Sequence, residues 1–446
     1  MKKLIIYFSI VAVTVAVGCS KKLDVLPTQS IDEKDAFTSD AKLKAVLLGA
    51  YDAISNGYLL GGDLQLYSEL LGADDEIIWA GTFSEPREIW GKRILVNNDY
   101  VALTWSRGYK VVGICNNILK HLDVVNEDDR DRVEGEARFL RGLVLFELVK
   151  LYAKPYTAGN VTTNLGLQLI TEPTENGQIT DVNFVPRSTV QETYDFILDD
   201  LLFAKANVPE DNSVYATKFV VAAFLSRVYL QMENFEGARD EADYVIDQGP
   251  YQLVDTIPQA FNNIVNSSED IFAMQVSEKD GDNDMHLFWS TSDYGARAGD
   301  VEVEDKHFAL YEAGDDRSFL FFDDYYTEKF KLNFKNLSII RLAEMYLTRA
   351  ETNERLGTTV GGATPADDLN LIRSRSNLGP IGAPTLDDIT FERHIELAFE
   401  GQRIHDIKRL RQSVEGYDYD ANELVFPIPL REINASNGAL EQNDGY

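Results

Sequence analysis

Cysteine is scarce in this chain of 446 residues, which contains only two. Cys19 lies in the N-terminal segment, so Cys115 is the one thiol in the rest of the chain. Neither a disulfide framework nor a cysteine metal site can be built from a single thiol. Because Cys115 lies beside Ile114 and Ile118 in a helical pattern, we expect it to be buried and unpaired rather than reactive.

Basic residues are also few. The chain has 42 Lys and Arg against 73 Asp and Glu, which gives a formal net charge of -31 at pH 7. Because nucleic-acid binding relies on cationic side chains that neutralise phosphates, a nucleic-acid partner is not expected. The mean charge leaves room for a local basic pocket, but it favours a neutral ligand. Long linkers rich in Pro, Ser or Gly are missing, so a single domain over residues 33–446 is expected.

Motifs of metal and phosphate chemistry are missing too. Neither an HExxH motif nor a phosphate-binding glycine loop occurs. His394 and His405 lie too far apart along a helix to bind one metal ion from one face, so we expect no metal site and no cofactor. No complete EF-hand spacing occurs, yet the aspartates of residues 280–284 and 315–324 leave a structural calcium ion open as an alternative.

No catalytic residues are assigned. A glycoside hydrolase needs two carboxyl groups, and Asp74 with Asp284 could serve as its acid and base. Because the chain is rich in acidic residues, such pairs are easy to propose and carry little information. A hydrolase is therefore only an alternative to a binding protein without catalytic activity.

The N-terminal segment has the pattern of an export signal. Its apolar run, residues 4–17, is shorter than the roughly 20 residues of a membrane-spanning helix and follows two lysines. We therefore predict a signal peptide over residues 1–18. The small Gly18 precedes Cys19, which fits a lipoprotein cleavage site, so we predict lipidation of Cys19 and a lipidated tether over residues 19–32. An ordinary signal peptide with a chance cysteine is the alternative.

Amphipathic helical segments recur in pairs along the chain. In the longest of them, residues such as Ala137, Leu140 and Val144 fall on one helical face. Repeated helix pairs predict a mainly α fold, a tetratricopeptide-like solenoid with long irregular insertions. The expected pairs are residues 41–54 with 101–122, 130–152 with 190–206, 218–232 with 235–247, and 337–356 with 366–375.

Irregular insertions separate these pairs at residues 60–98, 156–186 and 249–336. Loops on a rigid frame carry variable chemistry, so ligand contacts are expected there. A carbohydrate site needs aromatic platforms for sugar faces and polar groups for hydroxyls, and the first and third insertions have that composition. The candidate ligand-binding residues are Trp79, Trp289, Trp90, Tyr294, Asp74 and Arg297. The alternative is that each tryptophan packs its loop onto the frame.

The segment at residues 392–410 is the most informative. Its apolar residues have the spacing of a buried helical stripe, and Glu396, Glu400, Arg403 and Asp406 can pair at one-turn separations, which indicates a structural role. Its pattern of acids, arginines and apolar residues resembles the signature of the SusD/RagB family. Further segments similar to that family, in family order, are residues 23–27, 136–141, 187–190, 223–230 with 235–246, 340–351 with 369–375, 424–429 and 442–446.

The resemblance implies a function and a location. SusD/RagB proteins are outer-membrane lipoproteins of Bacteroidetes that capture glycans, or less often peptides, for a TonB-dependent transporter. It therefore implies a surface-exposed, lipid-anchored glycan-binding protein without catalytic activity that serves a SusC-like transporter. It also implies four tetratricopeptide-like units, a core position for Trp105, and sugar-binding aromatics from the first and third insertions. A peptide-binding RagB-like subunit and a scaffold with a peptide in its helical grooves are alternatives.

Overall fold

The computed structural model of the chain describes residues 36–173, 184–279 and 281–446. The predicted signal peptide at residues 1–18, the lipidation site Cys19 and the tether at residues 19–32 lie outside these residues and stay predictions. In the described part of the chain, no helix is both long enough and apolar enough to span a membrane.

Helices make up 52% of the described residues, which confirms the prediction of a mainly α fold. The helices in the described residues are α3 (Asp40–Ile54), α4 (Asp63–Leu71), α5 (Ser84–Trp90), α6 (Asp99–Lys120), α7 (Glu127–Tyr152), α8 (Val190–Asn207), α9 (Lys218–Gln231), α10 (Phe235–Gln248), α11 (Asp284–Trp289), α12 (Asp305–Phe308), α13 (Leu342–Leu356), α14 (Pro365–Arg375), α15 (Leu386–Glu396), α16 (Arg403–Arg409) and α17 (Leu430–Ala435). Short 3-10 helices include η4 (Ser292–Tyr294) and η6 (Glu328–Phe330).

Strands are short, and in the described residues they form two-stranded antiparallel sheets. The pairs are β1 (Ile77–Trp79) with β5 (Val301–Val303), β2 (Leu165–Gln168) with β3 (Arg187–Thr189), β4 (Asp270–Met274) with β8 (Leu337–Arg341), and β6 (Phe321–Phe322) with β7 (Tyr326–Thr327). Except for β2 and β3, these strands belong to the first and third insertions or border them.

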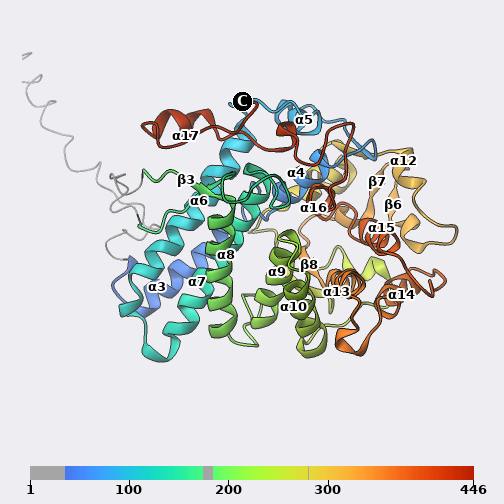
Figure 1. Ribbon diagram of the computed structural model, residues 1–446, viewed down its shortest axis with the longest axis horizontal. Coiled ribbons are helices and arrows are strands. Elements are labelled where there is room, and N and C mark those ends of the chain that lie inside the picture. Colours follow the sequence, from blue (N-terminus) through green and yellow to red (C-terminus); the bar gives the residue numbers. More distant parts are fainter. Residues whose placement is uncertain (1–35, 174–183, 280) are drawn as a thin grey trace, which may run out of the picture.

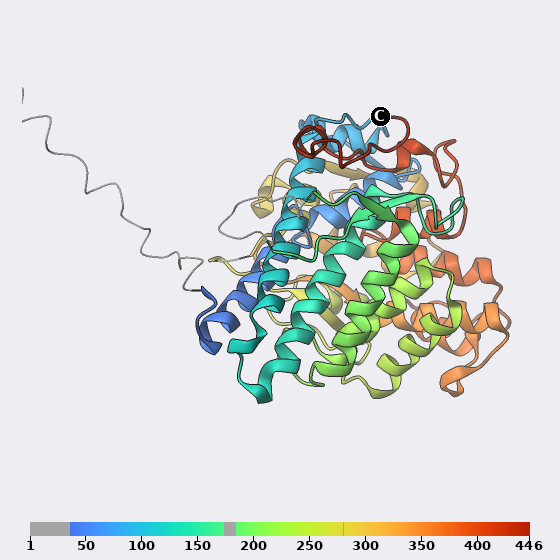
Figure 2. The ribbon, with the colours of Figure 1, turned by 60° about the vertical axis from the view of Figure 1, so that its left-hand side comes forward.

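The long helices pack in the predicted pairs: α3 against α6, α7 against α8, α9 against α10, and α13 against α14. Contacts of α6 with α7, α8 with α9, and α10 with α13 join each pair to the next. Figure 1 shows this helical layer running from α3 on the left to α14 on the right. Figure 2 shows the same helices lying side by side. The shorter helices α4, α5, α12 and α16 lie along one edge of the layer (Figure 1).

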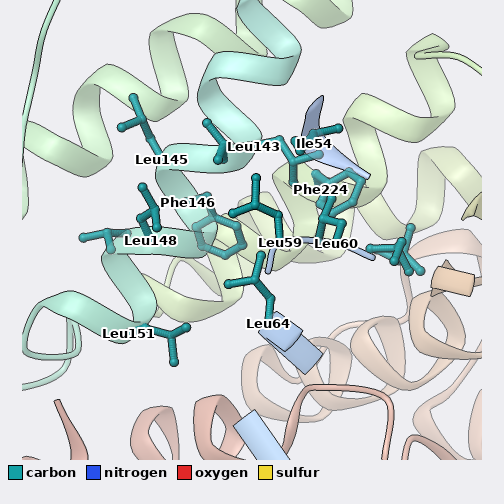
Figure 3. Close-up of a cluster of buried hydrophobic side chains, with 14 of the residues drawn as sticks. Ile54, Leu59, Leu60, Leu64, Leu143, Leu145, Phe146, Leu148, Leu151 and Phe224 are labelled. Atoms are coloured by element: carbon teal, nitrogen blue, oxygen red, sulfur yellow. The ribbon is translucent and has the colours of Figure 1, made fainter. Parts of the chain in front are cut away.

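The core lies where α7 meets its neighbours. Leu143, Phe146 and Leu148 of α7 are buried with Phe224 of α9 and with apolar residues from the start of the first insertion (Figure 3). Burying each of these side chains stabilises the fold by roughly 1.5–3 kcal/mol. Gly108 lets α6 approach α7 closely, because a Cβ atom there would lie 2.7 Å from a methyl carbon of Leu148.

Two predictions for residues of α6 are confirmed. Trp105 is 2% exposed and packs edge-on against Tyr152 of α7, with 5.0 Å between ring centroids. Cys115 is fully buried and unpaired, and burial raises the pKa of its thiol to about 12. Because the thiolate is the reactive form, this cysteine is inert at neutral pH.

Helix starts follow the local sequence. Thr189, Thr364 and Thr385 cap α8, α14 and α15, and each hydroxyl accepts a hydrogen bond from a backbone N–H in the first turn. An acidic residue three positions later bonds back to the backbone N–H of the threonine, which completes a capping box. These caps fix where the three helices begin.

The predicted helix over residues 392–410 is interrupted, which corrects the sequence prediction. α15 ends at Glu396 and α16 begins at Arg403. Between them, Phe399 and Gly401 have positive φ angles of 69° and 83°. Glycine is required at the second position, because a Cβ atom there would lie 2.7 Å from the Cα of Gln65 in α4. The interruption therefore lets α4 pack closely against this segment.

The charged residues of this segment are structural, but the prediction of pairing at one-turn separations is wrong for most of them. Their partners come from distant parts of the chain and are largely buried. The pairs are Glu396 with Arg375 at 2.5 Å, Glu400 with Arg341 at 2.7 Å, Arg403 with Glu76 at 3.0 Å, and Asp406 with Arg393 at 2.9 Å. Asp406 also pairs one turn along with Arg409 at 2.6 Å.

Candidate functional site

The first and third insertions lie side by side. Their strands β1 and β5 pair in antiparallel register, with Ile77 opposite Val303 and Trp79 opposite Val301. Helix α11, in the third insertion, also contacts α4 in the first. Both insertions were predicted to carry ligand contacts, but their pairing joins residues more than 200 positions apart and has no local signal in the sequence.

Trp79 and Trp289 are packing residues in this structure. Trp79 is 2% exposed, its ring centroid lies 5.6 Å from that of Phe288, and its indole N–H donates to the carbonyl of Phe83 at 3.0 Å. Trp289 is fully buried, with the ring of Phe399 at 4.9 Å. Neither indole has a face open to a ligand, because apolar side chains from other segments cover both.

Trp90, at the end of α5, is partly buried. Its indole N–H donates to the carbonyl of Ile77 at 3.1 Å, which ties α5 to β1. The rest of the ring packs against the edge of the core. Trp90 therefore keeps part of its surface open to solvent while its orientation is fixed.

Tyr294, at the end of η4, is the most exposed of the candidate aromatics, at 36%. Its ring packs edge-on against Phe322 at 5.4 Å, and the ammonium of Lys331 lies 4.7 Å from its centroid. Burial lowers the pKa of Lys331, but hydrogen bonds to Glu328 and Tyr294 outweigh it and the net pKa is raised. The phenol is thus held by an aromatic ring and a charged lysine while it stays accessible.

Arg297 joins the two insertions. Its guanidinium lies 3.8 Å from the ring centroid of Phe83, its Nε donates to Asp300 at 2.5 Å, and its Nη2 donates to Thr82 at 3.1 Å. The side chain is 28% exposed. Among the described residues Nη1 has no hydrogen-bond partner, so the fixed plane offers donors to a ligand hydroxyl.

Asp74 belongs to a different part of the molecule. Its carboxylate accepts from Lys306 at 2.9 Å and from the backbone N–H of Glu415 at 3.2 Å. It lines a cavity of about 540 Å³ beside α15 and α16. The walls of this cavity include Glu69, Asp74, Glu76, Lys306, His394 and Arg403.

Two buried glutamates at this cavity have opposite electrostatic properties. Burial raises the pKa of Glu69 to about 7, although its carboxylate accepts backbone hydrogen bonds from Gly401 and Gln402 at 2.8 and 3.1 Å. Burial also acts to raise the pKa of Glu76, but hydrogen bonds from His307 and His394 outweigh it and hold the pKa well below its usual range. Glu76 therefore stays ionised at neutral pH, whereas Glu69 gains or loses its proton near pH 7.

Asp74 and Asp284, the two carboxylates considered as the acid and base of a hydrolase, have different neighbours. Asp284 adjoins Asp63, and burial with the charge of Asp282 raises the pKa of Asp284 to about 7. Asp74 is bound by Lys306, as described above. In the segment considered for calcium at residues 315–324, Asp315 is neutralised by Arg317 at 2.8 Å, and Asp280 lies outside the described residues.

Several residues of this region were not predicted from the sequence. Phe322 and Lys331 support Tyr294, but no local pattern connects them with it. His307 and His394 meet at Glu76 although they come from distant segments, so the spacing of His394 and His405 on one helix did not predict this cluster. Spacing along one helix reveals nothing about partners from another segment.

Two family models match the chain. The model described as SusD-like, "Starch-binding associating with outer membrane", matches residues 21–230, and the model described as "SusD family" matches residues 317–425. "SusD-like protein P2" of Formosa agariphila is 25% identical over the whole length of both chains. "Starch-binding protein SusD" of Bacteroides thetaiotaomicron is 31% identical, but over 25% of this chain and 22% of its own length.

Solved structures show the same fold. A SusD superfamily protein of Bacteroides thetaiotaomicron superposes with a TM-score of 0.79 at 23% identity, covering 91% of this chain and 99% of its own. A structure described as "Laminarin binding SusD-like protein" superposes with a TM-score of 0.76 at 22% identity, covering 92% of this chain and all of its own. Similarity at this identity supports the architecture rather than any particular ligand.

Proposed function

The chain belongs to the SusD/RagB family of carbohydrate-binding proteins without catalytic activity, and from this premise we propose that it captures an oligosaccharide or polysaccharide at the cell surface. Family membership confirms that it is not an enzyme. The matching family model is described as associating with the outer membrane, which gives the coarse location. The surface exposure, the lipid at Cys19 and the delivery of the ligand to a SusC-like TonB-dependent transporter are parts of the proposal.

The observation that carries the proposal is the pairing of β1 with β5, which joins the two insertions into one surface. In these insertions, Tyr294 offers an accessible ring, Arg297 offers donors on a fixed plane over Phe83, and Trp90 offers a partly exposed indole, and the proposal is that a glycan contacts all three. Aromatic faces and planar donors are the groups that a neutral sugar needs. We call Trp90, Tyr294 and Arg297 the contact residues, and the proposed ligand surface that they form the contact surface.

The other candidate residues have supporting roles in this proposal. Trp79 and Trp289 form the buried base beneath the contact surface, since each packs against side chains that fix the insertions. Asp74 holds Lys306 at the neighbouring cavity rather than at the contact surface. Replacing these residues should change ligand affinity through stability or position.

The experiment that tests the proposal begins with the purified protein and a panel of polysaccharides. A polysaccharide that retards the protein in affinity electrophoresis is then cut to oligosaccharides for calorimetric titration. The proposal predicts saturable binding that is lost when the contact residues are changed. Absence of binding to every polysaccharide, together with saturable binding of peptides, would replace it with a peptide-binding function.

A peptide is the second candidate ligand, because the cavity beside α15 and α16 carries both acidic and basic side chains. Charges of both signs suit the termini and side chains of a peptide better than the hydroxyls of a neutral sugar. Substitution of Lys306 by Ala distinguishes the two ligands. It should weaken peptide binding at the cavity and leave glycan binding at the contact surface unchanged.

A further inference from the structure

Glu76, His307 and His394 meet at one point although they come from three distant segments. Glu76 directly precedes β1, His307 lies in α12, and His394 lies in α15. The Oε2 atom of Glu76 lies 2.8 Å from Nδ1 of His307 and 2.9 Å from Nε2 of His394. One donor atom from each residue falls within 4.8 Å of the other two.

Two imidazoles and a carboxylate form a ligand set that suits zinc and similar divalent transition metals. Ligand atoms of a tetrahedral zinc ion lie roughly 3.3 Å apart, given metal–ligand distances of about 2.0–2.2 Å. The separations from Glu76 are shorter by a few tenths of an ångström, so a small outward movement of the side chains would admit an ion. A metal would then replace the hydrogen bonds of Glu76 with coordinate bonds from the same atoms.

We propose that Glu76, His307 and His394 bind a divalent transition-metal ion, with zinc as the ion of choice. Glu76 and His394 line the cavity beside α15 and α16, so water from that cavity can supply a further ligand. The ion would cross-link the first insertion, the third insertion and the C-terminal helices. This site is separate from the contact residues, and it holds whether the captured nutrient is a glycan or a peptide.

The surroundings of the site are arranged as metal ligands require. The second nitrogen of His307, Nε2, lies 3.0 Å from the hydroxyl oxygen of Tyr311, which can accept a hydrogen bond from Nε2–H when Nδ1 binds a metal. The backbone N–H of Glu304 donates to the carbonyl of Glu76 at 2.9 Å and so holds β1 against α12. His307 is fully buried and the side chain of His394 is 15% exposed, so both rings are held in place.

Arg403 places a positive charge next to the site without occupying the atom that would bind the metal. Its Nη2 donates to Oε1 of Glu76 at 3.0 Å. Oε2 lies nearest to both imidazoles, at 2.8 Å from His307 and 2.9 Å from His394, although Nε2 of His394 also lies 3.0 Å from Oε1. The carboxylate can therefore bind Arg403 through one oxygen and a metal through the other. Repulsion from the guanidinium should weaken metal binding, so Arg403→Gln should strengthen it.

The test uses the whole mature protein without a histidine tag, freed of metal with a chelator and titrated calorimetrically with zinc chloride. His394→Ala removes one ligand, and His394→Gln keeps a hydrogen-bonding side chain in case the alanine variant fails to fold. His121→Ala is the matched control, because this partly buried histidine bonds to the carbonyl of Asn117 at the end of α6. Circular dichroism establishes that each variant is folded.

We expect one equivalent of zinc to bind to the wild-type protein and to His121→Ala with the same affinity. Both His394 variants should bind at least about tenfold more weakly, because a ligand is lost. Zinc should raise the Tm of the wild type and not that of the His394 variants. No saturable zinc binding by the wild type, or equal binding by the His394 variants, would overturn the proposal and leave a hydrogen-bonded network around Glu76.

Discussion

The guanidinium of Arg297 lies 3.8 Å from the centre of the Phe83 ring, although the two residues come from different insertions. A guanidinium stacked on an aromatic face is attracted to it and held in one plane. The salt bridge to Asp300 at 2.5 Å fixes the direction of that plane. The two insertions therefore meet at Arg297, and on the proposed contact surface its polar groups are positioned before any ligand arrives, which would lower the entropy cost of binding.

Arg297→Lys should weaken glycan binding by roughly 1–2 kcal/mol while preserving the charge. The substitution removes the planar guanidinium, which both stacks on Phe83 and presents donors to ligand hydroxyls. Calorimetric titration with the cognate oligosaccharide measures the effect. Arg138→Lys is the control, because Arg138 similarly stacks on Phe203 at 4.2 Å but lies on the helical layer. Equal losses in both variants would mean that the effect is not local to the contact surface.

Trp289→Ala should lower the free energy of unfolding by about 3–5 kcal/mol, as for other large aromatic side chains removed from a core. The residue is fully buried against Phe399, so its removal leaves a cavity rather than a missing ligand contact. Urea denaturation measures the loss. Trp289→Phe should lose less, because it keeps an aromatic ring at the site. An unchanged unfolding midpoint with abolished glycan binding would instead make Trp289 a ligand platform.

Arg403→Ala should lower the free energy of unfolding by about 2 kcal/mol, because it removes a charged hydrogen bond from the buried carboxylate of Glu76. Glycan affinity of the folded protein should stay unchanged. Arg411→Ala is the matched control. Arg411 forms a salt bridge with Glu233, and the two side chains are 47% and 34% exposed. Because the salt bridge is exposed, this substitution should lower the free energy of unfolding by less than about 1 kcal/mol. Equal losses in chemical denaturation would contradict the structural role of Arg403.

Glu69→Gln should change how stability depends on pH. Burial raises the pKa of Glu69 to about 7 from its ordinary value near 4.5, so the folded state binds more protons than the unfolded state between these values. Stability contributed by the protonated form is therefore lost as pH rises through this range, by up to about 3 kcal/mol. Glutamine stays neutral and can still accept the hydrogen bond from Gly401.

The measurement is the free energy of unfolding in urea at pH 5 and pH 8. The wild-type protein should lose more stability between these two pH values than Glu69→Gln does, because all other titrating groups are common to both proteins. Asp406, whose pKa burial raises but Arg393 and Arg409 lower to about 2, contributes stability that is lost only in stronger acid. The same change with pH in both proteins would show that Glu69 is ionised throughout.

Cys19→Ala should release the protein from the membrane fraction. The short apolar run and Gly18 before the thiol predict lipidation, and an alanine cannot accept the lipid. Membrane fractionation and metabolic labelling with a fatty acid measure the change. Membrane retention and lipid labelling of the variant equal to those of the wild type would contradict anchoring through this cysteine.

The helical layer could be predicted from the sequence because helices arise from patterns among residues that are close in the chain. Apolar residues repeated with helical spacing, and turns such as the one before Phe235 separated the paired helices. The site depended on contacts between distant segments. Whether Trp289 is open or covered is decided by Phe399, and the partner of His394 is Glu76, 318 positions earlier in the chain. The close approach of α4, which requires Gly401, likewise ended the predicted helix early.

The most direct test of the account is calorimetric titration of Tyr294→Ala and Tyr244→Ala with the cognate oligosaccharide. Both tyrosines pack against a phenylalanine beneath a lysine ammonium, at 4.7 Å from Lys331 for Tyr294 and at 4.4 Å from Lys205 for Tyr244. Only Tyr294 lies on the proposed contact surface. The account predicts a loss of about 2 kcal/mol or more for Tyr294→Ala, as at other binding hot spots, and unchanged binding for Tyr244→Ala. Wild-type affinity in a folded Tyr294→Ala protein would contradict it.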